Sequence, residues 1–304
     1  MGTPPFAVPS LLRLVHDGYK LVAVCTKQDK TAGRGQELSY SAVKQTALKL
    51  SLPLFQLGSL NRSENQTALA RMAADLIVVV AFGQLLPPAV LNLPCYGCIN
   101  VHPSLLPFHR GASPIASTIL GGNKWSGVSL IQMDEGLDTG NIITQSKLLV
   151  RATDTTDTLS EKLAIVSATM LSEVLPLWVQ GSIKARAQEH SEATSSISLE
   201  KGDGEIDWSL PAVDIWRMAR AYQSWPGVFT KFNGKVVKLL EVYPVESELQ
   251  YPTGSVVTLG RGCAVCTGQG LLELRRLQVE GKRALSAIEF LNGQRTFIGS
   301  RLPC

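Results

Sequence analysis

Four continuous apolar runs constrain the fold of this chain more than any other feature. They are LVAVCT (21–26), LIVVVAFG (76–83), GCINVH (97–102) and GVSLIQM (127–133). Unbroken runs of Val, Ile and Leu indicate strands that are covered on both faces, whereas half-exposed strands alternate polar and apolar residues. Amphipathic segments that fit helices lie between the runs, near 7–17, 41–50, 63–73 and 113–121. This pattern predicts an α/β domain built on a doubly wound, mostly parallel sheet.

The rest of the chain divides at a polar stretch. The segment 140–150 alternates and predicts an antiparallel edge strand, and 156–180 predicts one long helix that completes a first domain over 1–181. Residues 182–203 show no periodic spacing of apolar residues, and we interpret them as a linker. Short strands separated by Gly-containing turns then predict a small OB-like β-barrel domain over 204–304.

The composition excludes several classes of protein. The chain is 45% hydrophobic and has a formal net charge of +4, a mild bias towards anionic partners. It contains no unbroken apolar run of about eighteen residues, the length that a membrane-spanning helix needs, and its start does not read as a secretion signal. We therefore expect a protein with no membrane partner, located in the bacterial cytoplasm or in an organelle matrix, and we expect a monomer.

Two CxxC pairs raise a zinc hypothesis, because this spacing is common among zinc ligands. The pairs are Cys95 with Cys98 and Cys263 with Cys266. They lie in different halves of the chain, far outside the usual spacing of a structural zinc site, and each is next to an apolar strand. Buried reduced thiols are the better interpretation, and we expect no metal.

Polar residues that could carry chemistry follow the strand over 97–102. Asn100 and His102 are two positions apart, so on a strand both side chains point to the same face. Ligands of parallel α/β sheets bind at the carboxyl ends of strands, where the sequence NVHPSLLP begins. Asp138, in DEGLDTG after the next strand, can return to the same crevice. Taken singly, His102 could be a packing residue, and Asp138 could bind its own turn.

This residue set fits direct attack of an amine on a carbonyl. An amide can donate hydrogen bonds to an oxyanion, an imidazole can move a proton, and a carboxylate can orient that imidazole. The sequence has no GxSxG nucleophile motif, no GxGxxG dinucleotide motif and no GxxxxGK[ST] phosphate loop. Covalent acyl transfer and nucleotide chemistry are therefore poorly supported.

The motifs NVHPSLLPFHRGASP and MDEGLDTG together resemble the signature of folate-dependent formyltransferases. GTPPFA, DKTAGRGQEL, PLFQLGSL, VVVAFGQLLP, GEIDWS and WPGVF extend the resemblance over nearly the whole chain, to the members that act on initiator tRNA. It implies a Rossmann-like formyltransferase domain that transfers the formyl group of 10-formyltetrahydrofolate, a co-substrate, to the α-amine of initiator methionyl-tRNA. Asn100, His102 and Asp138 match the catalytic triad of the family.

The resemblance also implies binding residues. The folate pocket would be lined by two segments, comprising Phe82, Gly83, Gln84 and Leu85 and then Ser104, Leu105, Leu106 and Pro107. Arg34 matches a loop residue that enters the acceptor end of the tRNA, and Phe6 matches an aromatic residue near the methionine side chain. Basic residues of the second domain would follow the tRNA phosphates; they are Arg217, Arg220, Lys231, Lys235, Lys238, Arg275, Arg276, Lys282 and Arg283.

One departure from the family keeps other functions open. In the family an apolar first strand precedes GTPxFA, but here only Met1 precedes Gly2, so we expect that strand to be missing. A catalytically inactive relative that binds RNA or folate is therefore one alternative. Another is a formyltransferase for a small amine, such as glycinamide ribonucleotide or a nucleotide-linked aminosugar, although the Arg34 loop and the basic second domain argue against it.

Overall fold

The computed structural model describes residues 1–32, 37–248 and 251–304. The chain forms two compact units. The first comprises Met1–Pro114, Lys124–Val150 and Leu159–Ile197, and the second comprises Ile115–Asn123, Arg151–Thr158 and Ser198–Cys304. Each unit has its own sheet, so we describe them separately.

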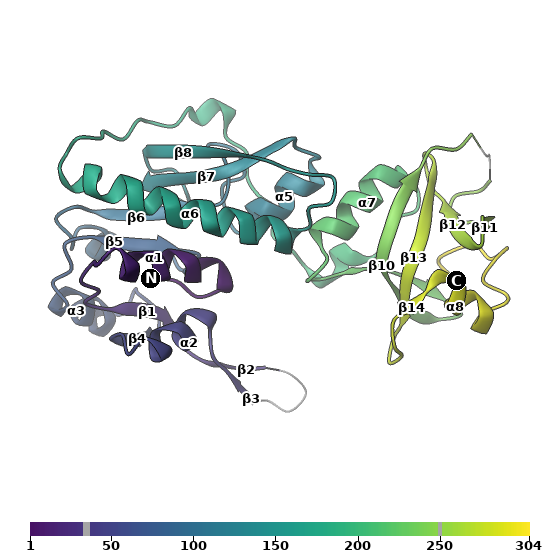
Figure 1. Ribbon diagram of the computed structural model, residues 1–304, viewed down its shortest axis with the longest axis horizontal. Helices are drawn as coiled ribbons and strands as arrows, with labels where there is room; N and C mark the ends of the chain where they lie inside the picture. The colour runs from purple at the N-terminus through teal and green to yellow at the C-terminus, as the bar shows by residue number, and fades with distance from the viewer. Residues whose placement is uncertain (33–36, 249–250) are drawn as a thin grey trace. The chain divides into compact units, whose positions relative to one another are not determined.

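The first unit contains both parallel and antiparallel strand pairs, and helices lie between several of its strands (Figure 1). β1 pairs with β4 in parallel, β5 pairs with β6 in parallel, and β6-β7-β8 is antiparallel. The strands are β1 (Val24–Lys27), β4 (Leu54–Leu57), β5 (Ile77–Val80), β6 (Cys98–His102), β7 (Trp125–Gln132) and β8 (Ile142–Leu149). A separate hairpin consists of β2 (Lys30–Ala32) and β3 (Glu37–Ser39). The expected antiparallel edge strand is confirmed as β8.

Met1 and Gly2 connect the β1-β4 pair to the β5-β8 sheet. The Val80 amide donates to the Met1 carbonyl over 2.9 Å, and the Gly2 amide donates to the Cys25 carbonyl over 2.9 Å. Gly2 also forms an isolated parallel bridge with Val80. Two residues therefore provide backbone pairing between β1 and β5.

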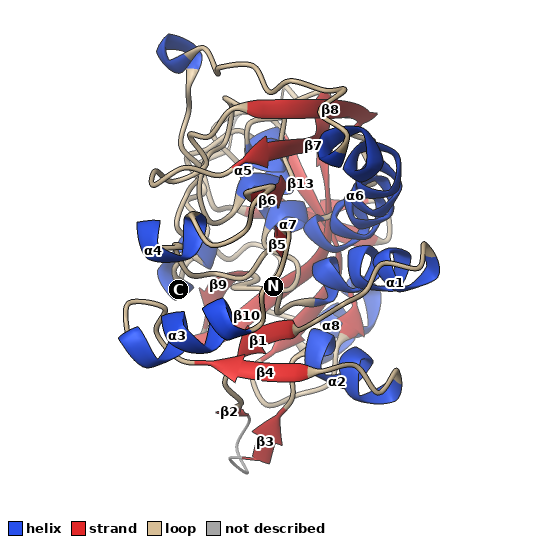
Figure 2. Ribbon diagram, turned by 90° about the vertical axis from the view of Figure 1, so that its left-hand side faces the viewer, coloured by secondary structure: helices blue, strands red, loops and turns tan. Residues whose placement is uncertain are grey.

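Helices cover both faces of this layer, as Figure 2 shows: α1, α2 and α6 lie on one side, and α3 and α4 on the other. The doubly wound arrangement is therefore confirmed. The helices are α1 (Val8–His16), which follows the short 3-10 turn η1 (Pro5–Ala7), α2 (Ala42–Lys49), α3 (Ser63–Arg71), α4 (Pro88–Leu91) and α6 (Thr156–Val179). The Ser41 hydroxyl caps α2 by accepting from the Lys44 amide, as a helix N-cap should.

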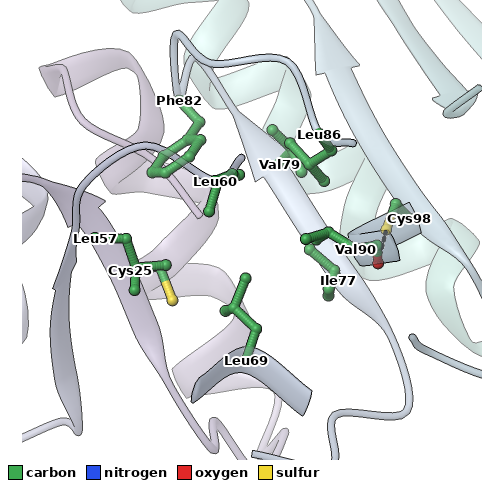
Figure 3. Close-up of a cluster of buried hydrophobic side chains, with 10 residues drawn as sticks. All are labelled: Cys25, Leu57, Leu60, Leu69, Ile77, Val79, Phe82, Leu86, Val90 and Cys98. Atoms are coloured by element: carbon green, nitrogen blue, oxygen red, sulfur yellow. Dashed lines mark hydrogen bonds between the residues drawn. The ribbon is translucent and has the colours of Figure 1, made fainter. Parts of the chain in front are cut away.

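A buried apolar cluster packs α3 and α4 against the strands (Figure 3). Its side chains come from four strands (β1, β4, β5 and β6), both helices and the segments after β4 and β5, and are Cys25, Leu57, Leu60, Leu69, Ile77, Val79, Phe82, Leu86, Val90 and Cys98. β5 and β6 run through the centre of this layer and are packed by this cluster. The polar motifs begin at the carboxyl ends of these two strands.

The direction of β7 differs from what its sequence indicates. The run over 127–133 reads as a strand of a parallel sheet, yet β7 pairs antiparallel to β6, with Ile99 opposite Gln132 and His102 opposite Ser129. Six consecutive residues of β7 are buried. Burial on both faces produces the continuous apolar run in either direction, so the pattern does not report strand polarity.

The long helix α6 is also the one helix in the described part of the chain that has the length and apolar composition of a membrane span. Nine of its side chains are buried, among them Leu159, Leu163, Leu171 and Leu175. A core helix of a globular protein has the same composition, and the buried side chains show that one face of α6 packs into the unit.

The thiols of both CxxC pairs are free, and Cys98, Cys263 and Cys266 are buried. Burial raises the pKa of the Cys98 thiol to about 12 and that of Cys263 to about 11. Across residues 1–32, 37–248 and 251–304, no cluster of three His, Cys, Asp or Glu side chains has the arrangement of a metal site.

The second unit is built on a six-stranded antiparallel sheet in the order β11-β12-β13-β10-β9, with β14 beside β13. Its strands are β9 (Val228–Phe232), β10 (Lys235–Val245), β11 (Val256–Leu259), β12 (Gly262–Cys266), β13 (Leu271–Val279) and β14 (Leu285–Ser286). Its helices include α5 (Pro114–Leu120), α7 (Ala212–Ala221) and α8 (Ala287–Gly293), and a short turn η3 (Lys201–Gly204) precedes α7. The side chain of Phe297 is fully buried and meets Phe232 and Phe290 edge to face.

The segment predicted to be a linker contains little regular structure but many contacts. Apart from the 3-10 turn η2 (His190–Glu192), the part up to Ile197 is irregular and belongs to the first unit. Arg186 forms a bridge with Ile142 at the start of β8, and Ser195 forms a parallel bridge with Arg110. We refer to residues 186–196 as the strap.

Candidate active site

The three predicted catalytic side chains meet at the end of β6. Asp138 lies between the other two: its Oδ1 accepts from the Asn100 amide over 3.1 Å, and its Oδ2 lies 3.4 Å from Nδ1 of His102. The backbone amide of Gly111 also donates to Oδ2 over 2.8 Å. Both Asn100 and His102 therefore point to the same side of β6, as their spacing predicts.

The loop after β7 turns back to bring Asp138 to this position. It starts beside Ile99, at the opposite end of β6 from His102. Asp134 organises the loop, since its Oδ1 accepts from the Gly136 amide over 3.1 Å and from the Thr139 hydroxyl over 2.7 Å. A Cβ atom at Gly140 would lie 1.9 Å from the Gln132 carbonyl oxygen, so only glycine permits this close return.

Asp138 itself adopts a left-handed backbone conformation, with φ of 55°. An L-residue pays roughly 1–2 kcal/mol for this region, and Asp is among the residue types that tolerate it best. Two hydrogen-bond donors, Asn100 and Gly111, therefore hold the carboxylate on this strained backbone, and His102 lies beside it.

His102 is 4% exposed and has an acceptor at each ring nitrogen. Its Nε2 lies 3.0 Å from the carbonyl oxygen of His109, and its Nδ1 faces Asp138. Burial holds the pKa of His102 below its ordinary value, while the Asp138 charge and the His109 carbonyl oppose that effect. A neutral imidazole has one N–H and can satisfy one of these acceptors, whereas an imidazolium satisfies both. Protonation of His102 would therefore give each of these two acceptors a donor.

The burial of His102 predicts that folding stability falls on acidification. Because the pKa of His102 is lowered from 6.5 in the native protein, the unfolded chain binds more protons between 6.5 and the native pKa. This contribution to the free energy of unfolding should be complete above 6.5 and should be lost as the pH falls towards the native pKa. Urea titrations over that range, compared with His102→Gln, measure it. An equally steep loss in the variant would contradict the prediction.

A hydrogen bond and packing in the core fix the backbone of the segment that follows β6. The Ser104 hydroxyl donates to the Phe108 carbonyl, and the side chain of Leu106 packs with Ile131 and Ile142 in a buried cluster. Leu106 therefore faces the core, and this part of the predicted pocket presents backbone and neighbouring side chains instead. Leu105 is half-buried.

The other predicted pocket segment follows β5, the parallel neighbour of β6, so both segments leave the same edge of the sheet. Phe82 is 1% exposed and belongs to the apolar cluster, whereas Leu85 is 61% exposed. Gln84 fastens the segment to the loop after β4: it accepts from the Leu60 amide over 3.2 Å and donates to the Gly58 carbonyl over 3.1 Å. Leu85 is thus the exposed apolar side chain of this segment, and the hydrogen bonds of Gln84 hold the segment in place.

The structure describes one of the two residues that the resemblance assigns to the tRNA substrate. Phe6 is 8% exposed and lies in the turn η1 before α1. Arg34 lies outside the described residues, between β2 and β3. The base of this hairpin is anchored by Lys44, whose ammonium contacts Asp29 and also donates to Gln56 over 2.9 Å.

Several of the basic residues expected to follow phosphates contact acidic side chains. Arg217 pairs with Asp214, Lys231 with Glu205, Arg275 with Glu273, and Arg283 with Glu289. Arg220 lies over the Trp216 ring, 3.9 Å from its centroid, and donates to the Asp154 carbonyl. Exposed ion pairs of this kind contribute little stability, so such a residue can exchange its partner for a phosphate at small cost.

Sequence reasoning missed the polar side chains that support these loops. Ser129 on β7 accepts from the Leu106 amide and donates to the Ser104 carbonyl, and Gln145 on β8 donates to the Leu106 carbonyl. Gln188 from the strap donates to the Asp138 carbonyl over 2.8 Å. A polar residue inside an apolar strand is a weak signal for Ser129, but no pattern singles out Gln188.

Comparison with protein families adds to this geometry. A family model described as formyl transferase matches residues 2–175, and a model described as formyl transferase, C-terminal domain, matches residues 198–295. A methionyl-tRNA formyltransferase of Dehalococcoides mccartyi is 43% identical over 303 residues, covering 99% of this chain and 97% of that protein. A protein of the same name from Alkaliphilus oremlandii is 40% identical over 294 residues, covering 96% of this chain and 95% of its own length.

Solved structures with a similar fold include a sugar formyl transferase and a protein that binds tetrahydrofolic acid. The sugar 3N-formyl transferase WlaRD, crystallised in the presence of dTDP and 5-N-formyl-THF, has a TM-score of 0.66 at 19% identity, covering 93% of this chain and 97% of its own. HypX from Aquifex aeolicus, in complex with tetrahydrofolic acid, has a TM-score of 0.59 at 20% identity, covering 83% of this chain and 44% of its own. At these identities the likeness concerns the fold.

Proposed function

The chain belongs to the formyl transferase family, and from this membership we propose that it transfers the formyl group of 10-formyltetrahydrofolate to the α-amine of initiator methionyl-tRNA. The single observation that supports the site is the contact of Asp138 with both Asn100 and His102. An amide, an imidazole and a carboxylate in one place suit attack of an amine on a formyl carbon.

Asn100 would stabilise the tetrahedral intermediate. Attack of the amine forms a C–N bond and places negative charge on the former carbonyl oxygen. One N–H of the Asn100 amide is engaged by Asp138, and an amide carries two N–H donors, so the second remains to face the oxyanion. The bond to Asp138 also orients the amide, so little reorganisation is needed when charge develops.

His102 and Asp138 would manage the proton. The attacking amine becomes positively charged and must lose a proton before the C–N bond to the folate N10 breaks, while N10 must gain one. Burial keeps the pKa of His102 low, which favours a neutral imidazole as acceptor, and the Asp138 carboxylate stabilises the imidazolium that results. To meet the substrate, Nε2 must exchange the His109 carbonyl for the reacting groups.

The remaining residues would bind the two substrates together, so that proximity supplies a large part of the rate. The pterin would lie between the segments after β5 and β6, with Phe82, Gly83, Gln84 and Leu85 on one side and Ser104, Leu105, Leu106 and Pro107 on the other. Phe6 would face the methionine side chain. We propose that the enzyme works in the cytoplasm, since the relatives named above are bacterial proteins, and that it acts as a monomer.

A formyl-transfer assay with three acceptors tests the function. We expect kcat/KM for initiator methionyl-tRNA to exceed that for glycinamide ribonucleotide or a nucleotide-linked aminosugar by at least about 10³-fold, because a site built for one polar partner rejects others strongly. Preferred use of a small amine would contradict the tRNA assignment. Absence of transfer to all three would contradict the enzymatic function.

Replacing Arg34 separates tRNA recognition from chemistry. A guanidinium that pairs with phosphate or a base edge is worth about 1–3 kcal/mol, so Arg34→Ala should lower kcat/KM for the tRNA by about 10- to 100-fold. Folate affinity should not change. Arg71→Ala, at the exposed end of α3, is the matched control. Full tRNA activity of Arg34→Ala would contradict the role of this residue.

A further inference from the structure

The strap lies directly against the loop that carries His109, Arg110 and Gly111. The Thr194 hydroxyl accepts from the His109 amide over 2.9 Å, and the Thr194 carbonyl accepts from the Arg110 amide over 2.8 Å. Since the His109 carbonyl contacts Nε2 of His102, the strap supports the backbone group that meets the imidazole. His109 has φ of 58°, a strained conformation that such bonds help to hold.

Gln188 makes the most specific contact between the strap and the site. Its side chain is 5% exposed, and its amide nitrogen donates to the carbonyl oxygens of Asp138 and Gly140 over 2.8 and 2.7 Å. Its amide oxygen accepts from Nε and Nη2 of Arg110 over 3.2 and 2.7 Å. One buried amide therefore joins the loop of Asp138 to the loop of Gly111, and Gly111 is itself a donor to Asp138.

The chemistry of this position requires a primary amide. Two backbone carbonyls need two N–H donors on one side, and the Arg110 guanidinium needs an acceptor on the other, and only Asn and Gln combine both functions. The bonds fall on the two residues where the loop is most constrained: Asp138 has a positive φ, and Gly140 approaches the Gln132 carbonyl too closely for any Cβ atom. Unsatisfied buried carbonyls at this point would cost stability and would release the strained backbone.

We propose that Gln188 is a positioning residue for formyl transfer: through the carbonyls of Asp138 and Gly140 it sets the place of the Asp138 carboxylate, and through that carboxylate the orientation of Asn100 and His102. This role rests on the proposed function. Gln188 does not touch the reacting atoms, so its loss should act on kcat and leave folate binding nearly unchanged. A displacement of about 1 Å at a catalytic group is enough to cost about 10²-fold in rate.

Gln188→Glu tests the role without changing the size of the side chain. A carboxylate still accepts from Arg110 but cannot donate to the two carbonyls. We expect kcat to fall by about 10- to 100-fold with little change in KM for 10-formyltetrahydrofolate. Gln188→Ala removes both sets of bonds and should lower kcat at least as much. Glu189→Gln, a reverse exchange at the exposed neighbouring residue of the strap, should keep wild-type kinetics.

A double-mutant cycle distinguishes positioning from general support. If Gln188 acts through Asp138, adding Gln188→Glu to Asp138→Asn should lower kcat by less than about twofold beyond Asp138→Asn alone. Additive losses, a purely KM effect, or an active wild type with an equally active Gln188→Glu would each overturn the positioning role while leaving the proposed function standing. A wild-type protein that formylates no amine would overturn both.

Discussion

Asn100→Ala and His102→Ala are each expected to lower kcat by about 10²- to 10³-fold, the loss that follows removal of one donor to an oxyanion. The affinity for 10-formyltetrahydrofolate should barely change, because both side chains act on charge that exists only during the reaction. Steady-state kinetics with charged initiator tRNA, together with direct folate titration, separate the two quantities.

The expected loss has a structural reason in each case. Asn100 offers a second N–H while its first is held by Asp138, and His102 lies between that carboxylate and the His109 carbonyl. Asn92→Ala and His16→Ala, at exposed positions, are matched controls. A variant that mainly weakens folate binding and turns over normally when saturated would show that its side chain holds substrate and performs no chemistry.

Phe297→Ala is expected to reduce the free energy of unfolding of the second unit by about 3–5 kcal/mol, as deletions of large buried aromatic side chains do. The Phe297 ring is 0% exposed and has its centroid 4.9 Å from that of Phe232 and 5.0 Å from that of Phe290, both near perpendicular. Such a loss is a large part of the stability of an ordinary domain.

Urea unfolding of the full chain, followed by tryptophan fluorescence, measures this effect. Trp208 is buried in the second unit and donates to the Thr230 hydroxyl, so its emission reports on that unit. Ile298→Ala, at the exposed next residue, is the control and should cost far less. A loss below about 1 kcal/mol for Phe297→Ala would mean that the cavity closes by repacking.

The sequence predicts those features of this protein that follow from periodicity. The spacing of Asn100 and His102 determines that they share one face of β6, and continuous apolar runs locate β1, β5 and β6. The same runs do not report direction, and so β7 reads as a parallel strand although it is antiparallel. Asp138 nevertheless reaches the site, because its loop folds back along the sheet.

The support of the site could not be predicted, because it consists of single side chains bound to distant backbone. Gln188 contacts carbonyl groups 48 and 50 residues earlier in the chain. A polar, aperiodic stretch of sequence is typical of a linker and also of a segment that is fixed by many individual hydrogen bonds. Likewise, no sequence pattern shows that the apolar side chain of Leu106 packs with Ile131 and Ile142 in the core.

The strap also limits how this protein can be recombined. A chimera that joins residues 1–181 to the second half of another enzyme would retain every reacting group and lose the residues that hold Asp138 and His109 in place. A fusion point after Ile197 keeps these bonds, since the strap belongs to the first unit up to that residue. Engineers who exchange acceptor-binding domains should therefore place the junction after Ile197, beyond the polar segment that the sequence pattern marks as a linker.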